Sequence, residues 1–151
     1  MPVDALTPED AAMQGDAVVP GDVEALAMVA TEPLSFWGGY DAATGEIIDR
    51  RHPLSGQCAA GRVLVLPGAR GSSTGTAVLL EAVRVGQAPA ALVTDGRDSF
   101  FALAAIVARL MYGRSFVVVA MDARQMSAIP AGALVRIASD GRVSVVAGTA
   151  A

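Results

Sequence analysis

Apolar residues along this chain fall into short runs that alternate with longer stretches of helical length. The short runs are rich in β-branched residues and bounded by Gly, Pro or Asp, and they predict buried strands at 63–66, 89–94 and 116–121. The longer stretches predict helices at 77–85 and 100–112, each followed by a glycine that can end it. Strands that alternate with helices in this way pair in parallel through crossover connections.

Segments on both sides of this unit predict further strands. Residues 18–50 indicate strands of an antiparallel, barrel-like sheet, because short apolar runs there alternate with turn residues such as those at 20–22. Near the end of the chain, 133–138 and 142–146 flank a Ser-Asp-Gly turn and predict a hairpin. The expected fold is therefore α/β, with a β-barrel-like sheet joined to parallel strands and their crossover helices.

Length and composition indicate a single domain with surface left over for a partner. The chain has 151 residues, enough for a proper core. Residues 1–17 predict a flexible leader, since Gly15 and Asp16 would end any helix there, and residues 18–151 form the domain. Hydrophobic residues make up 53% of the sequence and charged residues 17%, a balance that favours an interface with another protein.

Charge and the rarest residues argue against several functions. The formal net charge is −4 and the 11 basic residues are scattered, so nucleic-acid binding is not expected. The stretch 100–112 is too short to span a bilayer, and the acidic start does not resemble a signal peptide, so we expect no membrane association and a cytoplasmic setting. Cys58 and His52 are the single cysteine and histidine, too few for a disulfide or for a metal site.

The loop between the strand at 63–66 and the following helix is the best candidate for a functional site. Its residues from Gly68 to Gly75 are small or hydroxylated, and Arg70 is its one cation. Glycines let a ligand approach the backbone, and the first turn of a helix presents unpaired N–H groups. Such a loop suits a carboxylate or a phosphate, although serine and threonine at a helix start also serve as plain caps. It fits neither the Walker A pattern nor the dinucleotide fingerprint.

Other polar residues predict structural roles. His52 is expected to hydrogen-bond within its loop, and Cys58 to fill a buried position. Asp41 and Asp49 are expected to form turns. A second loop at 95–98 should lie near the first one at the carboxyl ends of the strands, where ligands of such sheets gather.

One stretch resembles the phosphohistidine swivel domains. Residues 104–109, with the sequence Ala-Ala-Ile-Val-Ala-Arg, are similar to a helix of those domains in which Ser-His precedes the same motif. Leu103 stands where they carry the phosphorylated histidine, so phosphocarrier chemistry is not expected. The resemblance implies a swivelling β/β/α fold.

A longer resemblance covers residues 18–148. The motifs SFWGG at 35–39, TGEIID at 44–49, HPL at 52–54 and the stretch 61–75 together resemble the small subunit, or swivel domain, of the aconitase X group. This resemblance implies a hydro-lyase built from two polypeptides. The large partner would carry an iron–sulfur cluster on its own cysteines, and the swivel domain would close over a small carboxylate substrate.

The same resemblance implies roles for the loop residues. The serine that directly follows Arg/Lys-Gly is the proposed catalytic base of the group, which places this role on Ser72. Residues around it would bind the substrate carboxylate: Arg70, Gly71, Ser73 and Thr74. A helix N-terminus and the neighbouring cation would both favour the serine alkoxide.

The resemblance implies one of two substrates. Members of the group dehydrate cis-3-hydroxy-L-proline, giving Δ1-pyrroline-2-carboxylate, or a mevalonate 5-phosphate. The Arg-rich and Lys-free composition is more typical of a bacterial member, which favours hydroxyproline. Two alternatives remain open: the small subunit of a phosphomevalonate dehydratase, and a non-catalytic swivel module that binds a small anion or scaffolds a complex.

Overall fold

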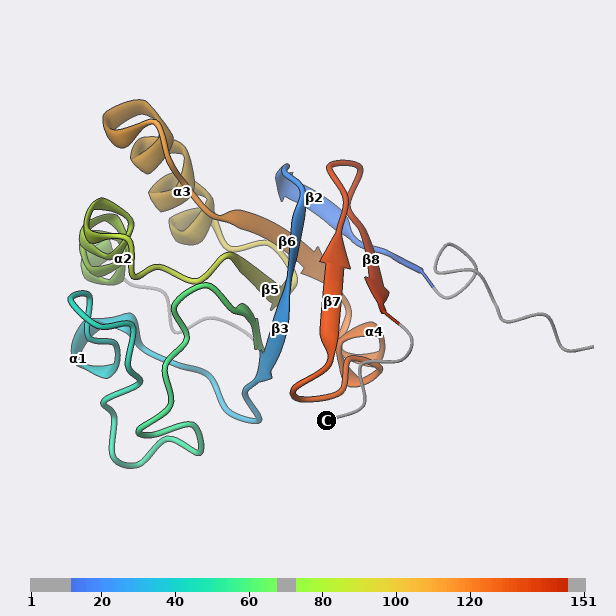
Figure 1. Cartoon of the computed structure of the whole chain (residues 1–151), viewed down its shortest axis with the longest axis horizontal. Coiled ribbons are helices and arrows are strands. Elements are labelled where there is room, and N and C mark those ends of the chain that lie inside the picture. The colour runs from blue at the N-terminus through green and yellow to red at the C-terminus, as the bar shows by residue number, and fades with distance from the viewer. Residues whose placement is uncertain (1–11, 68–72, 147–151) are drawn as a thin grey trace, which may run out of the picture.

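The computed structural model describes residues 12–67 and 73–146. In these residues eight strands form one mixed sheet in the order β1-β8-β7-β3-β4-β5-β6-β2 (Figure 1). The strands are β1 (Met13–Gln14), β2 (Asp16–Val19), β3 (Val23–Val29), β4 (Val63–Leu66), β5 (Ala91–Asp95), β6 (Val117–Met121), β7 (Leu134–Ile137) and β8 (Arg142–Val145). The helices are α1 (Phe36–Gly39), α2 (Ser73–Val85), α3 (Ser99–Tyr112) and α4 (Ala123–Ser127).

Strands β3 to β6 form the parallel centre of the sheet. β4 pairs with β3 on one side and with β5 on the other, and β5 pairs in turn with β6, all in parallel. β4 and β6 are buried along their whole length, as continuous apolar runs in parallel sheets require. α2 connects β4 to β5 and α3 connects β5 to β6, so the predicted strand–helix–strand units are confirmed.

The sheet nearly closes on itself, because β1 and β2 follow each other in the chain yet pair at its opposite ends. β1 is antiparallel to β8 and β2 is antiparallel to β6, with only Gly15 between them. At this seam the N–H of Gly15 donates to the carbonyl oxygen of Gly141 at 2.9 Å. A Cβ atom on Gly141 would lie 2.5 Å from the carbonyl oxygen of Gly15, so the close approach requires glycine. The predicted barrel-like sheet is confirmed in this form.

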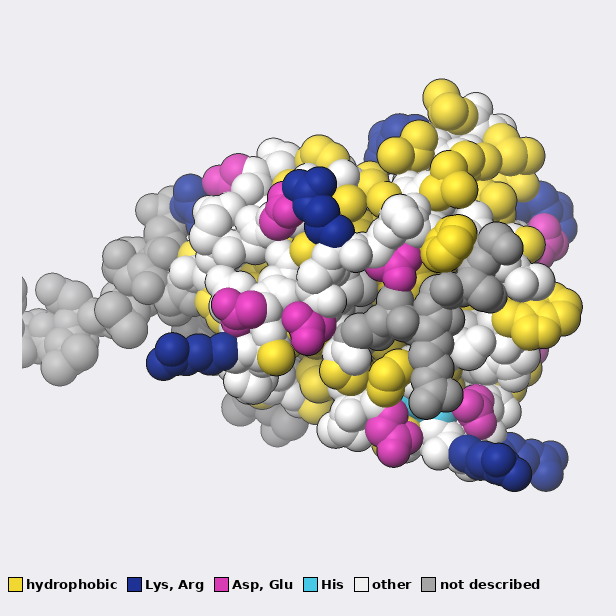
Figure 2. All heavy atoms as spheres, turned by 180° about the vertical axis from the view of Figure 1, so that it is seen from behind, with side chains coloured by type: hydrophobic (Ala, Val, Ile, Leu, Met, Phe, Trp, Pro, Cys, Tyr) yellow, Lys and Arg dark blue, Asp and Glu magenta, His cyan; other side chains and the backbone are white. Residues whose placement is uncertain are grey.

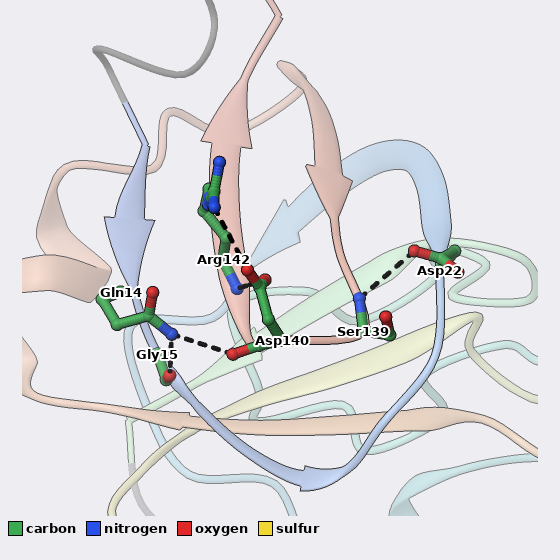
Figure 3. A network of polar contacts seen from close by, with 6 residues as sticks. All are labelled: Gln14, Gly15, Asp22, Ser139, Asp140 and Arg142. Carbon is green, nitrogen blue, oxygen red and sulfur yellow. Dashed lines mark hydrogen bonds and ion pairs between the residues drawn. The ribbon is translucent and has the colours of Figure 1, made fainter.

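Polar side chains reinforce the seam (Figure 3). Gln14 of β1 donates from Nε2 to the carbonyl oxygen of Asp140, at 2.9 Å, in the turn between β7 and β8. The Asp140 carboxylate accepts from the N–H of Arg142 at 2.9 Å and pairs with its guanidinium at 3.2 Å. The N–H of Ser139 donates to Asp22, just before β3, at 3.2 Å. These contacts tie the first strand to the predicted hairpin of β7 and β8, which is also confirmed.

Two apolar cores lie on opposite faces of the sheet. On the outer face, α2, α3 and the segment 30–60 cover the strands, with Phe36, Leu79 and Phe101 among the buried side chains. On the inner face, alternate side chains of the strands pack together with Met126 of α4. The helices therefore cover the parallel strands from outside, while the barrel is filled from within.

The prediction that residues 18–50 form strands of an antiparallel sheet is wrong for most of that range. β2 pairs with β6, and β3 pairs with β7 and β4, so the two do not form a hairpin. Between β3 and β4 the chain forms α1 and loops, with single bridges at Tyr40–Ile47 and Glu46–Cys58. The local pattern indicated extended chain but not its partners, which lie far away in the sequence. Residues 13–14 and 16–17, which the sequence placed in the leader, belong to β1 and β2.

Polar contacts rather than strand pairing hold the segment 30–60. Tyr40 donates its hydroxyl to the carbonyl oxygen of Gln87 at 2.6 Å, and burial, with a smaller effect of the Cys58 thiol, raises the pKa of Tyr40 above its usual range. The carboxylates of Asp41 and Asp49 each accept from the N–H two residues further on, so both are the turn formers that the sequence predicted.

The apolar pattern does not predict the short helix α4. This helix begins with a capping box, in which the Asp122 carboxylate accepts from the N–H of Gln125 at 2.7 Å. The Gln125 side chain accepts in return from the N–H of Asp122 at 3.1 Å. The Asp-x-x-Gln spacing is the sequence signal that could have located α4.

Candidate functional site

The carboxyl ends of β4 and β5 and the amino ends of α2 and α3 meet at one edge of the sheet (Figure 1). β4 ends at Leu66 and α2 begins at Ser73, while β5 ends at Asp95 and α3 begins at Ser99. This edge of a parallel sheet is where ligand sites form. The segments that flank both predicted loops therefore come together where the sequence suggested.

The predicted site residues Arg70, Gly71 and Ser72 lie outside the described residues. Ser73 and Thr74 belong to the first turn of α2, and Thr74 is exposed there. The first turn of a helix of 13 residues presents N–H groups that attract an anion. The structure thus places the positive end of α2 directly after Ser72 in the chain.

An aromatic cluster supports the start of α2. The ring of Phe36 lies 5.2 Å from that of Tyr40 and 5.5 Å from that of Phe101, the second contact being edge-to-face. Gly75 faces the same cluster, since a Cβ atom there would lie 3.5 Å from the Cβ of Phe36. The amino ends of α2 and α3 therefore rest on one shared group of buried rings.

The loop between β5 and α3 has all but one of its charged side chains engaged. The Asp98 carboxylate caps α3, accepting from the N–H groups of Phe100 at 2.8 Å and Phe101 at 3.0 Å. Arg97 pairs with Asp16 at 2.6 Å, and this contact raises the pKa of Arg97 above its usual value. The carboxylate of Asp95 has no hydrogen-bond or ion-pair partner among the described residues. It is therefore the carboxylate of this loop that remains available to a ligand.

A cavity of about 180 Å³ opens between the carboxyl ends of β3, β4 and β5 and the helix α4. Val29, Val65 and Met126 give it mostly apolar walls, and Asp95 is the charged side chain among the described residues that line it. Pro67, the last described residue before the predicted loop, also lines it. Apolar walls with one carboxylate suit a small aliphatic ring that carries a cationic amine.

The sequence indicates only part of this cavity. It predicts a ligand site near the loop at 95–98, but no local pattern marks Val29, Val65 or Met126 as lining residues. Their meeting depends on the order of strands in the sheet and on α4. The capping-box spacing of α4 was a usable local signal, whereas nothing local marks the two valines as pocket residues.

A wider hollow of about 660 Å³ lies beside Glu32, Asp49, Arg51 and His52. The imidazole of His52 already has hydrogen-bond partners there. The imidazole of His52 is 5% exposed; its Nδ1 accepts from the N–H of Leu54 at 3.1 Å, and its Nε2 donates to the carbonyl oxygen of Glu32 at 3.0 Å. Both ring nitrogens are thus bonded to backbone, and neither is free to act as a base or a ligand. The predicted structural role of His52 is confirmed.

The residues of this chain do not fit an iron–sulfur cluster. Such clusters are held by several cysteine thiolates, and the sequence contains only Cys58. The prediction that Cys58 is buried is wrong: it is exposed, as are the loop residues 55–57 before it, and its thiol donates to the carbonyl oxygen of Thr44 at 3.3 Å. Within residues 12–67 and 73–146 there is also no group of three or more His, Cys, Asp or Glu side chains that could hold a metal ion. In the same residues, each helix is too short or too polar to cross a bilayer.

A family model for the aconitase X swivel domain matches residues 12–145. This chain belongs to the aconitase X swivel domain family. The match begins just before β1, in keeping with the strands found at 13–14 and 16–19.

Two relatives show how this domain occurs in other proteins. The chain is 42% identical to cis-3-hydroxy-L-proline dehydratase of Pseudomonas aeruginosa over 130 residues, which are 85% of this chain and 22% of that protein. It is 34% identical to the phosphomevalonate dehydratase small subunit of Thermococcus gammatolerans over 137 residues, which are 90% of this chain and 98% of that subunit. The chain thus spans about a quarter of the length of the hydroxyproline dehydratases that it matches and nearly all of that small subunit.

The fold is also that of a solved aconitase X. The crystal structure of Thermococcus kodakaraensis aconitase X in its holo form superposes with a TM-score of 0.80 at 29% identity, covering 89% of this chain and 98% of that one. This similarity confirms the α/β swivel-domain fold that the sequence predicted.

Proposed function

We propose that this chain is the small, swivel subunit of an aconitase X-type hydro-lyase that acts as a cis-3-hydroxy-L-proline dehydratase. The observation that carries the proposal is the 42% identity to the Pseudomonas aeruginosa dehydratase, which extends over 85% of the chain. The dehydratase of Hypocrea jecorina, a second relative with the same name, is 35% identical over 93% of the chain. The product is Δ1-pyrroline-2-carboxylate, formed in the cytoplasm.

The chemistry is assigned to the loop that leads into α2. Ser72 removes the proton beside the substrate carboxylate, and four neighbours bind that carboxylate: Arg70, Gly71, Ser73 and Thr74. A serine hydroxyl is a weak base unless its alkoxide is stabilised. The positive end of α2, which begins one residue later, and the guanidinium charge of Arg70 both favour the anion. Loss of this proton and of the 3-hydroxyl group as water gives an enamine, which tautomerises to the product.

The cavity at the carboxyl ends of the strands supports an amine substrate. Its volume of about 180 Å³ and its apolar walls suit a five-membered ring, with Asp95 available to pair with the ring ammonium. The carboxylate would then point toward the start of α2. A phosphorylated substrate would instead bring negative charge toward Asp95, which is unfavourable at short distance.

A large partner subunit holds the iron–sulfur cluster in this proposal. The sequence contains one cysteine, so these residues do not supply the ligands of the cluster that the family resemblance implies. The Pseudomonas aeruginosa relative contains this domain as only 22% of its length. We propose that the partner subunit corresponds to the rest of that protein.

The small subunit of a phosphomevalonate dehydratase is the second candidate. It is favoured by the match to the Thermococcus gammatolerans subunit, which covers 90% of this chain and 98% of that subunit. The lining of the cavity argues for hydroxyproline, and the two substrates can be compared directly.

The test is the activity of this chain co-expressed with the large subunit from the same organism. The assembled enzyme should convert cis-3-hydroxy-L-proline and leave mevalonate 5-phosphate unchanged, as followed by NMR. Asp95→Asn should raise KM for hydroxyproline at least about tenfold while kcat changes little, because the ion pair to the ring nitrogen is lost. Turnover of the mevalonate phosphate would support the second candidate, and turnover of neither would leave a non-catalytic swivel module.

A further inference from the structure

The outward face of α3 is the most extended apolar surface of the described chain. Its exposed residues are Phe100, Leu103, Ile106, Leu110 and Met111. Leu103 and Ile106 are about half exposed, and Leu110 is 80% exposed. The first four are spaced three or four residues apart and Met111 follows Leu110 directly, so they form one stripe along a helix about 21 Å long. Figure 2 shows the hydrophobic side chains gathered over α3, at the upper right of that view.

The amphipathicity of α3 is reversed relative to an ordinary surface helix. Such a helix turns its large apolar side chains toward the core. The buried residues of α3 are Phe101, Ala104, Ala105 and Ala108, so three of the four are alanines. These small side chains let α3 lie close to α2, while larger apolar groups face outward. The outward stripe therefore contributes little to holding α3 on its own domain.

Charges do not protect this face. Between Phe100 and Tyr112 the one charged side chain is that of Arg109, and there is no Asp or Glu. A lipid surface is a poor occupant, because interfacial helices carry several basic residues and this chain has a net charge of −4. An uncharged apolar stripe of this length is typical of a protein–protein interface.

The position of the stripe indicates which protein covers it. α3 begins four residues after Asp95, which lines the cavity, so a protein that covers this end of the sheet would lie close to the start of α3. In the Pseudomonas aeruginosa relative the domain is joined to a much longer remainder, since it makes up only 22% of that chain. We propose that the outward face of α3 is the docking surface for the large subunit. The inference rests on the proposed function.

The experiment uses the full chain and the large subunit from the same organism, mixed or co-expressed. Leu103→Glu and Leu110→Glu should each weaken the complex at least about tenfold in Kd, because each places a charge in an apolar contact. Leu26→Glu is the matched control: Leu26 is 41% exposed but belongs to β3, and its variant should bind as the wild type does. Circular dichroism and Tm should show that all three variants fold, since the side chains that they replace are exposed.

Oxidative footprinting provides a readout at the surface itself. Met111 is 61% exposed in the free chain and should be protected in the complex, whereas Met126, at 6%, should react slowly in both states. The inference is overturned if the α3 variants bind as tightly as the wild type or if Met111 is not protected. It is also overturned if Leu110→Glu disperses a dimer of this chain and leaves binding of the large subunit unchanged.

The two proposals fail in different ways. An active dehydratase whose assembly is insensitive to the α3 variants would overturn the docking surface alone. A complex that depends on Leu103 and Leu110 but dehydrates neither substrate would overturn the proposed function alone.

Discussion

The imidazole of His52 joins two loops, because one nitrogen accepts from the N–H of Leu54 and the other donates to the carbonyl oxygen of Glu32. In His52→Ala both backbone groups lose their partner, so the free energy of unfolding should fall by about 2 kcal/mol. The kcat of the assembled enzyme should not change. Urea unfolding and steady-state kinetics measure the two effects.

His52→Asn is the matched control for this prediction. Its side-chain oxygen can accept from an N–H two residues further on, as in an Asx turn, so it should recover part of the lost stability. A variant that is stable but has lost kcat would show that His52 takes part in the chemistry.

Ser72 carries the sharpest prediction about function. If it removes the proton, Ser72→Ala in the assembled enzyme should lower kcat by at least about a hundredfold. KM should change little, because the remaining loop residues still hold the carboxylate. Ser73→Ala is the matched control and should raise KM more than it lowers kcat.

Exchange of solvent deuterium into the substrate separates proton removal from the later steps. Wild type and Ser73→Ala should exchange the proton at the carbon beside the carboxylate, and Ser72→Ala should not. Exchange at the wild-type rate in Ser72→Ala would place the base on the partner subunit.

The identity of candidate residues was easier to predict from the sequence than the shape of the site. The loop from Gly68 to Gly75 stands out because the change from buried strand to helix is local. Asp95 was predicted only as part of a loop. Its carboxylate is left without a partner because Arg97 pairs with Asp16 and Asp98 caps α3, and these contacts are known only from the structure. Met126 was missed because it reaches the cavity from a helix that the apolar pattern does not show.

At the level of elements, the local pattern predicted the central parallel strands, their helices and the last hairpin, but neither α4 nor the partners of β2 and β3. The runs that became β4, β5 and β6 are uniformly apolar because both faces of a central parallel strand are covered. Residues 18–50 were predicted to form strands of an antiparallel sheet, yet Val19 of β2 pairs with Val118, far along the chain. The segment 30–50 resembled strands because loops that pack on a core also contain apolar residues.

The start of α3 depends on one side chain. Asp98 accepts from the N–H groups of Phe100 and Phe101, so Asp98→Ala should lower the free energy of unfolding by about 1 kcal/mol. Hydrogen exchange of those two amides should become faster, while the amides of β5 stay protected. Asp98→Asn keeps a capping oxygen and should resemble the wild type. Unchanged exchange in Asp98→Ala would mean that packing alone fixes this end of α3.

At the scale of the whole molecule, closure of the sheet joins the two ends of the domain. β1 lies beside β8, and Gln125 donates from Nε2 to the carbonyl oxygen of Gln14 at 3.0 Å, so α4 is attached to the same seam. α4 also forms one wall of the cavity. Opening the seam should therefore loosen the cavity wall as well as the first strand.

Gly141 is the position that tests this closure. It has a φ of +90°, and a Cβ atom there would meet the backbone of Gly15 at 2.5 Å, whereas Gly132 has a φ of +81° with nothing within 4 Å. Gly132→Ala should lower the free energy of unfolding by about 1 kcal/mol, from backbone strain alone. Gly141→Ala should lower it by a further 1 to 3 kcal/mol or so, because the seam must also move apart.

Hydrogen exchange distinguishes the two glycine variants. In Gly141→Ala the amides of β1 and β2 should exchange faster, while those of β4 and β5 stay protected, because only the seam has opened. Gly132→Ala has the same kind of strain but no clash, so its exchange along β1 and β2 should match the wild type. Equal losses of stability and equal exchange in the two variants would show that backbone strain, and not the close approach at Gly15, sets the requirement for glycine at 141.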